Sequence, residues 1–508
     1  MNIFHWVGQW RRTQPEKTAL CFRGRETSYL RLYTQACRIA AYLAKQGFDK
    51  GQRIAVLMDN CPEFIQIYLA CAGRGLILVP FNTRWVADEV GWALRNCEPA
   101  AVFYHAKYRQ RIIEGSDKSA MDNVLKVEIP ETQVDYLETR LHPAGRPGGD
   151  EVGSFDPVPP ESPHVIMYTS GTTGRPKGAV LSLRKTFFNC LNAQLFLDLR
   201  NDDRMLLSVP LFHSGGLFIQ ASPVLYRGAS LIIQPKFDAR ATYQDIRNYK
   251  ITKYSAVPTI MKKLLAVPRE MRADLSSLEI CAVGGEKLGE DLVEQCMAAG
   301  FPLYQIMGQT ETSIMLWASD KDLIVQPTTV GKPVLHGRVE VFDAGGSPVK
   351  PGEIGELAIS GPTLMSGYWR LPDQEKETFR DGWHYTGDMA RKNESGYFFM
   401  VDRYTDMYIS GGENVYPAEV ERVLKTHAAI IDIAVIGIPD SVWGQTGHAF
   451  VIKKPDTSLA EKDIRAFCKG RLAKFKWPTK ITFCDDFPRT ALGKIIKEKV
   501  KAKSFKKG

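Results

Sequence analysis

Apolar and polar positions alternate along the N-terminal part of the chain in two different periods. Apolar side chains recur three and four positions apart over 30–43, which predicts a helix that ends at Gly47. Short apolar runs over 53–58 and 101–104 predict buried strands instead. Further helices are expected at 2–14, 62–72 and 87–95, and further strands at 18–22 and 76–81. Strands that alternate with helices favour a parallel sheet with helices on its faces.

The pattern changes towards the C-terminus. Over 328–365 short strands alternate with glycine turns, which predicts an antiparallel subdomain. Helices are then expected at 417–424 and 460–472, and strands at 433–438, 449–453 and 480–483. At 508 residues the chain is too long for a single core. We therefore expect an α/β protein: a large domain, 1–402, of stacked and mostly parallel sheets with helices plus the antiparallel subdomain, and a small mobile α+β domain, 403–508.

Composition indicates an ordinary soluble protein. Hydrophobic residues make up 44% and charged residues 24% of the chain. There is no run of about 18 apolar residues to span a bilayer, and the opening MNIFHWVGQWRR is not a secretory signal. The ten cysteines are scattered without a C-x-x-C pair. This favours reduced thiols in a cytoplasmic protein over disulfides or a zinc site.

The net charge of +9 suits an anionic substrate, a membrane surface or a nucleic acid. Much of it comes from the tail, through Lys494, Lys497, Lys499, Lys501, Lys503, Lys506 and Lys507. A nucleic-acid face would interleave aromatic residues with the basic ones, and the tail offers only Phe505, so no nucleic-acid partner is expected. Peripheral contact with the inner face of the membrane through the basic surface stays open, as does the choice between monomer and homodimer.

A glycine- and hydroxyl-rich stretch follows an apolar run at 166–168. It reads Thr169, Ser170, Gly171, Thr172, Thr173, Gly174, Arg175, Pro176, Lys177, Gly178. Glycines let backbone N–H groups approach an anion, and hydroxyls and an ammonium group add donors, which predicts a polyphosphate loop. It is not a Walker loop, because Gly178 and Ala179 follow Lys177 where that motif needs Ser or Thr. This argues against an ATPase or a kinase.

This stretch resembles the signature loop of the adenylate-forming enzymes, which include acyl-CoA synthetases, luciferases and the adenylation domains of peptide synthetases. Four more motifs follow in the order of that family: YQIMGQTE at 304–311, WHYTGD at 383–388, DR at 402–403 with ISGGENVYPAE at 409–419, and PRTALGK at 488–494. The resemblance covers essentially the whole chain. The likeness is greatest to free-standing bacterial fatty acyl-CoA synthetases, particularly through SGGENVYPAE.

The resemblance implies a site for ATP. The nucleotide-binding residues would be Thr169, Ser170, Gly171, Thr172, Thr173, Gly174, Lys177, Gly284, Gly285, Glu286, Met307, Gly308, Gln309, Thr310, Asp388, Arg403 and Lys494. Met307 stands where the family usually stacks an aromatic ring on adenine, and a thioether can cover a base face in its place. Asp388 would accept both ribose hydroxyls, and Arg403 would contact ribose or phosphate.

The resemblance also implies catalytic roles for Lys494, Glu311, Thr169 and Lys177. Glu311 would be the magnesium ligand, because Mg²⁺ prefers one or two carboxylates together with phosphate oxygens and water. Lys494 would bridge the substrate carboxylate and the α-phosphate.

The remaining implied sites concern the acid, coenzyme A and the hinge. The acyl pocket would include Phe212, His213, Gly215 and Gly216, with His213 in a binding rather than an acid–base role. Coenzyme A would lie near Gly411, Trp443, Phe475 and Lys476. Asp402 would be the hinge about which the small domain turns between the two half-reactions.

The implied reaction forms an acyl-adenylate with release of pyrophosphate and then transfers the acyl group to coenzyme A. A medium- to long-chain fatty acid is the expected substrate. An aryl- or succinylbenzoyl-type acid, or a separate carrier protein in place of coenzyme A, are the alternatives.

Overall fold

The computed structural model describes residues 1–119, 124–131, 136–137, 156–169, 176–285, 288–403, 406–410, 413–440, 443–469, 471–472, 474–490, 493 and 495–504. The chain divides into two compact units. The first comprises Met1–Arg338 and Ile359–Gly382, and the second comprises Val339–Ala358 and Trp383–Gly508. The domain boundary expected at 402/403 stays a prediction.

Three helices form the N-terminal layer of the first unit, as the apolar spacing predicts. They are α1 (Ile3–Thr13), α2 (Tyr29–Lys45) and α3 (Pro62–Arg74), and they contact one another. Asn2 begins α1: its Oδ1 accepts the Phe4 N–H at 3.0 Å, and its Nδ2 donates to the Ala72 carbonyl in α3 at 2.7 Å. One residue thus caps the first helix and joins it to the third.

A seven-stranded sheet runs in the order β18-β8-β7-β4-β3-β5-β6. Its strands are β3 (Arg53–Leu57), β4 (Ile77–Pro80), β5 (Ala101–His105), β6 (Leu125–Ile129), β7 (Pro163–Thr169), β8 (Lys177–Ser182) and β18 (Gly367–Tyr368). The neighbouring strands β7, β4, β3, β5 and β6 are parallel. Strand β8 pairs with β7, and β18 with β8, in the antiparallel direction. Val79 and Val102 pack in one core with Val90 and Leu94 of α4 (Ala87–Cys97), and α5 (Arg109–Ser119) contacts α4.

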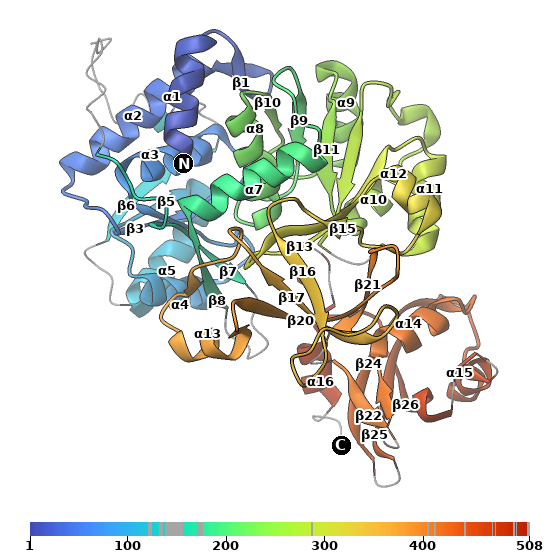
Figure 1. Ribbon diagram of the computed structural model, residues 1–508. Helices are drawn as coiled ribbons and strands as arrows, with labels where there is room; N and C mark the ends of the chain where they lie inside the picture. Colours follow the sequence, from blue (N-terminus) through green and yellow to red (C-terminus); the bar gives the residue numbers. More distant parts are fainter. Residues whose placement is uncertain are drawn as a thin grey trace. The chain divides into compact units, whose positions relative to one another are not determined.

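A nine-stranded sheet runs in the order β15-β14-β13-β12-β11-β9-β10-β1-β2. Its strands are β1 (Thr18–Phe22), β2 (Arg25–Ser28), β9 (Arg204–Leu207), β10 (Ser230–Ile233), β11 (Lys253–Ala256), β12 (Ile280–Val283), β13 (Leu303–Gln309), β14 (Ser313–Ala318) and β15 (Lys332–Pro333). Within this order the neighbouring strands β13, β12, β11, β9, β10 and β1 are parallel. Helices α9 (Ala239–Tyr249), α10 (Pro258–Leu265) and α11 (Glu290–Ala298) gather along one side of this sheet (Figure 1). Helix α7 (Leu183–Phe196) contacts both sheets, through β8 and β14.

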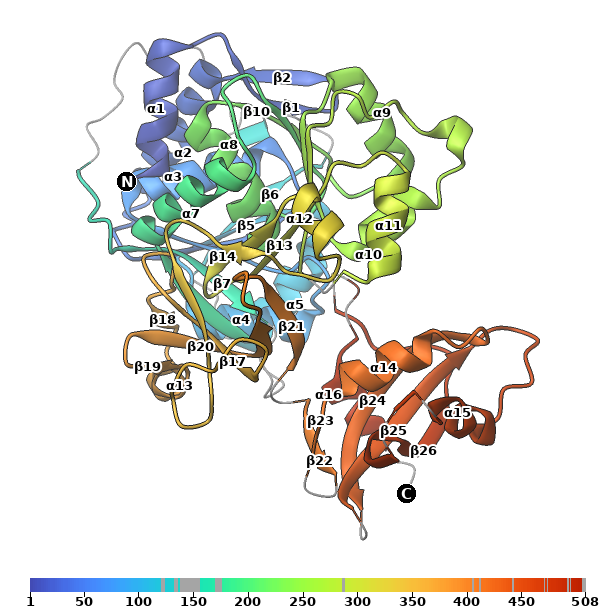
Figure 2. The ribbon, with the colours of Figure 1, turned by 45° about the vertical axis from the view of Figure 1, so that its right-hand side comes forward.

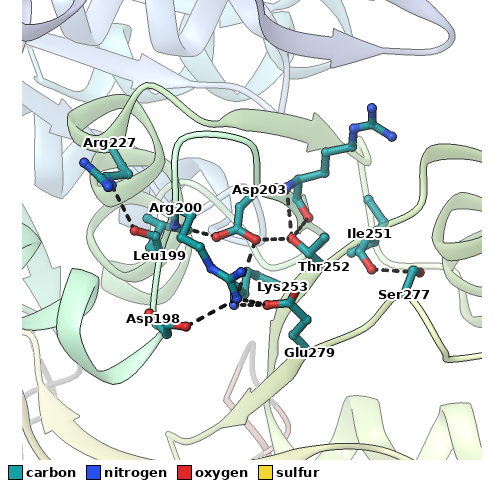
Figure 3. Close-up of polar contacts among 11 residues, drawn as sticks. Asp198, Leu199, Arg200, Asp203, Arg227, Ile251, Thr252, Lys253, Ser277 and Glu279 are labelled. Carbon is teal, nitrogen blue, oxygen red and sulfur yellow. Dashed lines mark hydrogen bonds and ion pairs between the residues drawn. The ribbon is translucent and has the colours of Figure 1, made fainter.

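A charged network lies where β9, β11 and β12 begin (Figure 3). The Lys253 side chain is fully buried, and its Nζ lies 2.8 Å from Glu279 Oε2 and 3.9 Å from Asp203 Oδ1. The Thr252 hydroxyl donates to the same Asp203 oxygen at 2.6 Å, and Arg200 pairs with Glu279 at 2.6 Å. The network joins the neighbouring strands β9, β11 and β12 at their N-terminal ends.

Replacing Lys253 by methionine should lower the free energy of unfolding by about 3 kcal/mol, because it leaves the buried Asp203 carboxylate without its cation. The lower end of the usual range is expected, since Glu279 is 42% exposed and can be hydrated. Denaturant unfolding measures the change. Lys263→Met, on the exposed face of α10, is the control and should alter stability by less than about 0.5 kcal/mol. An equal effect of both substitutions would contradict a stabilising role for the network.

The second unit contains two more sheets. The first includes β16 (Arg338–Phe342), β17 (Ile354–Ser360), β20 (Trp383–Lys392) and β21 (Phe398–Arg403). The second consists of β22 (Tyr408–Ser410), β23 (Glu413–Val415), β24 (Ile430–Asp440), β25 (Gly444–Lys453) and β26 (Pro478–Phe483). Helices α14 (Pro417–Lys425), α15 (Glu461–Cys468) and α16 (Lys497–Ser504) accompany the latter sheet (Figure 2). The helix expected over 460–472 ends at Cys468, because Lys469 has extended backbone angles.

Two predictions from composition can be compared with the structure. All ten cysteines are free, and eight are buried. Burial raises the pKa of several of these thiols, including Cys71 and Cys97, which suits reduced core residues. No helix in the described part of the chain is both long enough and apolar enough to cross a bilayer.

Candidate functional site

The carboxyl ends of the parallel strands bring several of the candidate residues to one edge of the nine-stranded sheet. Gly284 and Gly285 directly follow β12, and the segment 309–311 comes at the end of β13. His213 lies a few residues beyond β9. The charged network around Lys253 occupies the opposite edge, so the two sets of polar residues are separated by the length of the strands.

The hairpin of β7 and β8 places Thr169 directly opposite Lys177. The residues between them that carry the expected phosphate contacts, Ser170, Gly171, Thr172, Thr173 and Gly174, lie outside the described residues. Burial lowers the pKa of Lys177, and the negative charges of Glu377 and Glu311 partly oppose this. The Lys177 Nζ lies 5.7 Å from the centre of the Tyr368 ring, a cation–π contact.

The Glu311 carboxylate, in the turn between β13 and β14, is held by two hydroxyl groups from the strands β7 and β18. Its Oε1 accepts hydrogen bonds from the Thr169 hydroxyl at 3.2 Å and from the Tyr368 hydroxyl at 3.1 Å. The residue is only 8% exposed, and its backbone carbonyl accepts the Met365 N–H at 2.7 Å. Tyr368 belongs to β18, which pairs with β8 beside Ala179. The end of the β7–β8 hairpin and Glu311 therefore form one connected polar cluster.

Tyr368 is a member of this cluster that none of the sequence motifs contains. Nothing in its local sequence distinguishes it from the neighbouring aromatic Trp369. Its place in the cluster comes from the pairing of β18 with β8, two strands far apart in the chain.

The turn after β13 depends on a glycine. A Cβ on Gly308 would lie 2.1 Å from the carbonyl oxygen of Ser313, so no side chain fits there. The Gln309 N–H donates to the Thr312 hydroxyl at 3.1 Å, and the Thr310 hydroxyl lies 3.4 Å from that of Ser214. The turn thus links the Glu311 segment to the segment that carries His213. Met307 lies half-buried in β13 just before this turn.

The glycine pair after β12 is also closely packed. A Cβ on Gly284 would lie 2.5 Å from the Ile306 carbonyl oxygen in the neighbouring strand β13. Gly285 has a positive φ of 86°, which glycine adopts without strain. Glu286 lies outside the described residues.

His213 lies just before a short π-helical segment, Gly215–Ala221, and its ring packs on Phe212 with centroids 4.6 Å apart. Burial, with a smaller contribution from Arg84, lowers the His213 pKa to about 4, so the imidazole is neutral at pH 7. Its Nε2 is buried without a hydrogen-bond partner among the described residues.

The two glycines after His213 have different surroundings. A Cβ on Gly216 would lie 2.4 Å from the Pro210 carbonyl oxygen, so this glycine permits a close backbone approach. A Cβ on Gly215 would meet nothing nearer than a methyl of Val209 at 3.9 Å. Of the two glycines, only Gly215 therefore has room for a Cβ.

The second unit carries Asp388, Asp402 and Arg403. Asp388 is buried in β20 opposite Arg403 of β21, whose side chain lies outside the description. The Asp402 Oδ2 accepts the Ala418 N–H at 2.7 Å, which places a carboxylate at the N-terminus of α14. This is the end of a helix that favours negative charge.

The residues expected near coenzyme A also belong to the second unit. Lys476 Nζ lies 2.8 Å from each carboxylate oxygen of Glu419 and 5.6 Å from the centre of the Phe475 ring. Trp443 directly precedes β25, and its backbone N–H donates to Asp440 Oδ1 at 2.9 Å. Gly411 and Lys494 lie outside the described residues.

Glu311 fits the requirements of a magnesium site that is shared with a bound phosphate. No group of three or more His, Cys, Asp or Glu in the described part of the chain could hold a metal ion by itself. A magnesium ion at Glu311 would therefore take its other ligands from phosphate oxygens and water, as this ion prefers.

Comparison with known proteins identifies the family. The model of the AMP-binding enzymes matches residues 7–369, and the model of their C-terminal domain matches residues 419–494. The chain is 35% identical to an indoleacetate–CoA ligase of Aromatoleum aromaticum, over 99% of this chain and 98% of the relative. It is 34% identical to a feruloyl-CoA synthase of an Amycolatopsis species, over 98% of both.

A solved structure matches the whole fold. The o-succinylbenzoate CoA synthetase of Bacillus subtilis, in complex with its acyl-adenylate intermediate, aligns with a TM-score of 0.87 and 28% identity. The alignment covers 98% of this chain and 97% of that one. Both units of the chain, and the order of its sequence motifs, thus agree with one family. The protein belongs to the AMP-binding enzymes, the adenylate-forming superfamily that its signature loop resembles.

Proposed function

We propose that this acid–thiol ligase activates an aryl or arylalkanoic acid with ATP and transfers the acyl group to coenzyme A. The observation that carries ATP-dependent activation is the buried Glu311 carboxylate, joined by Thr169 to the end of the glycine-rich hairpin. The aromatic acid is supported by the relatives, since indoleacetate and ferulate are aromatic. These relatives favour the aryl alternative over the medium- to long-chain fatty acid expected from the sequence.

The first half-reaction joins two anions, so charge neutralisation and alignment dominate its barrier. A carboxylate oxygen of the acid attacks the α-phosphorus of ATP, and the bond to the β-phosphate oxygen breaks to release pyrophosphate. Thr169, Lys177 and the backbone of 170–174 would hold the β- and γ-phosphates, and Lys494 would neutralise charge between the acid and the α-phosphate. Magnesium bound at Glu311 would supply further positive charge to the departing pyrophosphate.

The nucleotide would be fixed at its other end by Gly284, Gly285 and Met307 around the base. Asp388, in the second unit, would accept the ribose hydroxyls. In the second half-reaction the thiol sulfur of coenzyme A attacks the acyl carbon, and AMP leaves. Trp443, Phe475, Lys476 and Gly411 would line the approach of coenzyme A, and the small domain would turn at Asp402 between the two steps.

The surroundings of His213 suit an aromatic group. The neutral imidazole places no charge in the pocket, and its buried Nε2 offers one hydrogen bond to a polar group of the substrate. A Cβ on Gly215 would meet nothing nearer than the Val209 methyl at 3.9 Å, so a substrate ring would approach the chain here. Because its pKa is so low, His213 would orient the acid and would not act as an acid or base at neutral pH.

Pyrophosphate release measured across a panel of acids, with and without coenzyme A, tests the proposal. The panel contains indole-3-acetate, ferulate, 2-succinylbenzoate, decanoate and palmitate. We expect kcat/KM for at least one aromatic acid to exceed that of both fatty acids by roughly a hundredfold, a difference that a shaped pocket can supply. Higher kcat/KM for a fatty acid would overturn the choice of substrate, and turnover that does not depend on coenzyme A would point to a carrier protein.

Gly215→Val is the matched variant for this experiment. The added side chain fills the space next to Val209, so it should raise KM for the aromatic acid and leave KM for MgATP within about twofold of the wild-type value. An equal change in both constants would show that the substitution disturbs the fold and not the pocket.

A further inference from the structure

Lys185 is a buried lysine close to the Glu311 cluster, and the proposed reaction assigns it no role. It lies in the first turn of α7, immediately after β8, and the Ser182 hydroxyl that begins this helix accepts the Lys185 N–H at 3.1 Å. The side chain is only 2% exposed. Its Nζ donates to the Ser313 hydroxyl at 2.6 Å and to the Thr363 carbonyl at 2.7 Å.

A lysine in this position is costly. Burial lowers the pKa of the Lys185 amino group to about 7, and the negative charge of Glu311 only partly opposes this. A methionine of similar length would fill the same space without the cost of desolvating a charge. The two hydrogen bonds of Lys185 therefore need an explanation other than packing.

These hydrogen bonds join two segments next to Glu311: the turn that ends at Ser313, and the segment from Thr363 to Met365 that contacts the Glu311 backbone. Ser313 closes the turn that contains Glu311, and its positive φ of 63° is unusual for a residue other than glycine. Thr363 precedes Met365 by two residues, and the Met365 N–H donates to the Glu311 carbonyl oxygen at 2.7 Å. One amino group thus restrains the chain just after Glu311 and the segment that supports the Glu311 backbone.

We propose that Lys185 is a positioning residue for Glu311: by holding Ser313 and Thr363 together it fixes the orientation of the carboxylate that meets magnesium and nucleotide. This inference rests on the proposed function of Glu311. Thr169 and Tyr368 fix the carboxylate group itself, whereas Lys185 fixes the backbone that carries it. Both hydrogen bonds of Lys185 Nζ go to protein groups, so Lys185 would act through Glu311 and not by contact with substrate or metal.

Lys185→Met tests the proposal through MgATP binding, measured calorimetrically without acid or coenzyme A. We expect Kd for MgATP and the half-saturating magnesium concentration to rise about tenfold, the effect of losing a well-placed polar contact. KM for the acid should change less than twofold. The matched control is Lys253→Met, which removes an equally buried lysine from the opposite strand edge. It should lower stability and leave MgATP affinity unchanged.

Ser313→Ala provides a second test, because it removes one partner and keeps the lysine. It should weaken MgATP binding about threefold, and the double variant should bind no more weakly than Lys185→Met alone, since the shared contact is already lost. If Lys185→Met does not fold, Ser313→Ala decides by the same measurement.

The outcomes separate two failures. Wild-type protein that binds no MgATP would overturn the proposed function. If the wild-type protein binds MgATP and Lys185→Met binds it with the same affinity, only the role of Lys185 is overturned. Where Lys185→Met does not fold, the same result with Ser313→Ala has the same meaning. Equal losses of affinity for acid and MgATP would make Lys185 a structural residue and would also overturn it.

Discussion

Replacing Lys494 by alanine should slow acyl-adenylate formation by about a hundredfold to a thousandfold, the usual effect of removing one preorganised group that stabilises transition-state charge. The carboxylate and the α-phosphate are both anionic as they approach, and alanine leaves their repulsion uncompensated. Thioester formation from supplied acyl-adenylate and coenzyme A should stay within about threefold of the wild-type rate, because that step transfers an acyl group to a thiol and needs no such bridge.

The two rates are measured separately, by pyrophosphate release and by thioester formation. Lys499→Ala is the control: Lys499 is an exposed lysine of α16, close to Lys494 in sequence, and its loss should change neither rate. Equal slowing of both half-reactions by Lys494→Ala would show that the lysine does not act on the first step alone.

Glu311→Gln should lower the rate of pyrophosphate release by about a hundredfold and raise the magnesium requirement at least tenfold. The amide has the shape of the carboxylate, and its oxygen can still accept from Thr169 and Tyr368. The negative charge that attracts magnesium is lost, however, and magnesium strongly prefers carboxylate oxygen. The measurement is a magnesium titration of pyrophosphate release at fixed ATP.

Tyr368→Phe serves as the matched comparison for Glu311→Gln. It keeps the carboxylate charge and removes one hydrogen bond to it, so the rate should fall only severalfold. A Glu311→Gln enzyme with wild-type magnesium dependence would exclude Glu311 as the metal ligand. A Tyr368→Phe enzyme as impaired as Glu311→Gln would place the decisive interaction in the hydroxyl.

Periodic elements were predictable from the sequence, and irregular ones were not. Helices α1 and α2 agree with the expected spans because each buries one face against its neighbours, whereas α3 is buried almost all round and is apolar along most of its length. Strand β2 (Arg25–Ser28) was not predicted, since it is a short edge strand whose first two side chains are exposed. Its pairing with β1 depends on a tight turn and carries no apolar alternation.

The candidate site shows the same division. Thr169, Lys177 and Glu311 stand in local motifs that the sequence displays directly. Lys185 follows Arg184, and no local pattern distinguishes the two basic residues. The structure separates them: the Arg184 side chain is 49% exposed and pairs with Glu161, whereas Lys185 is buried between segments more than a hundred residues away. Such a role is set by tertiary contacts alone.

The contact between Asp402 and Ala418 has a mechanical consequence. A hinge residue whose side chain is unattached can turn without affecting its neighbours, but the Asp402 carboxylate is bound to the first turn of α14. If the chain turns at Asp402, either α14 moves with it as one rigid lever, or the helix loses a cap worth about 1 kcal/mol. A turn at Asp402 that kept this hydrogen bond would carry α14 with it, so the hinge residue and the start of the helix would move as a single part.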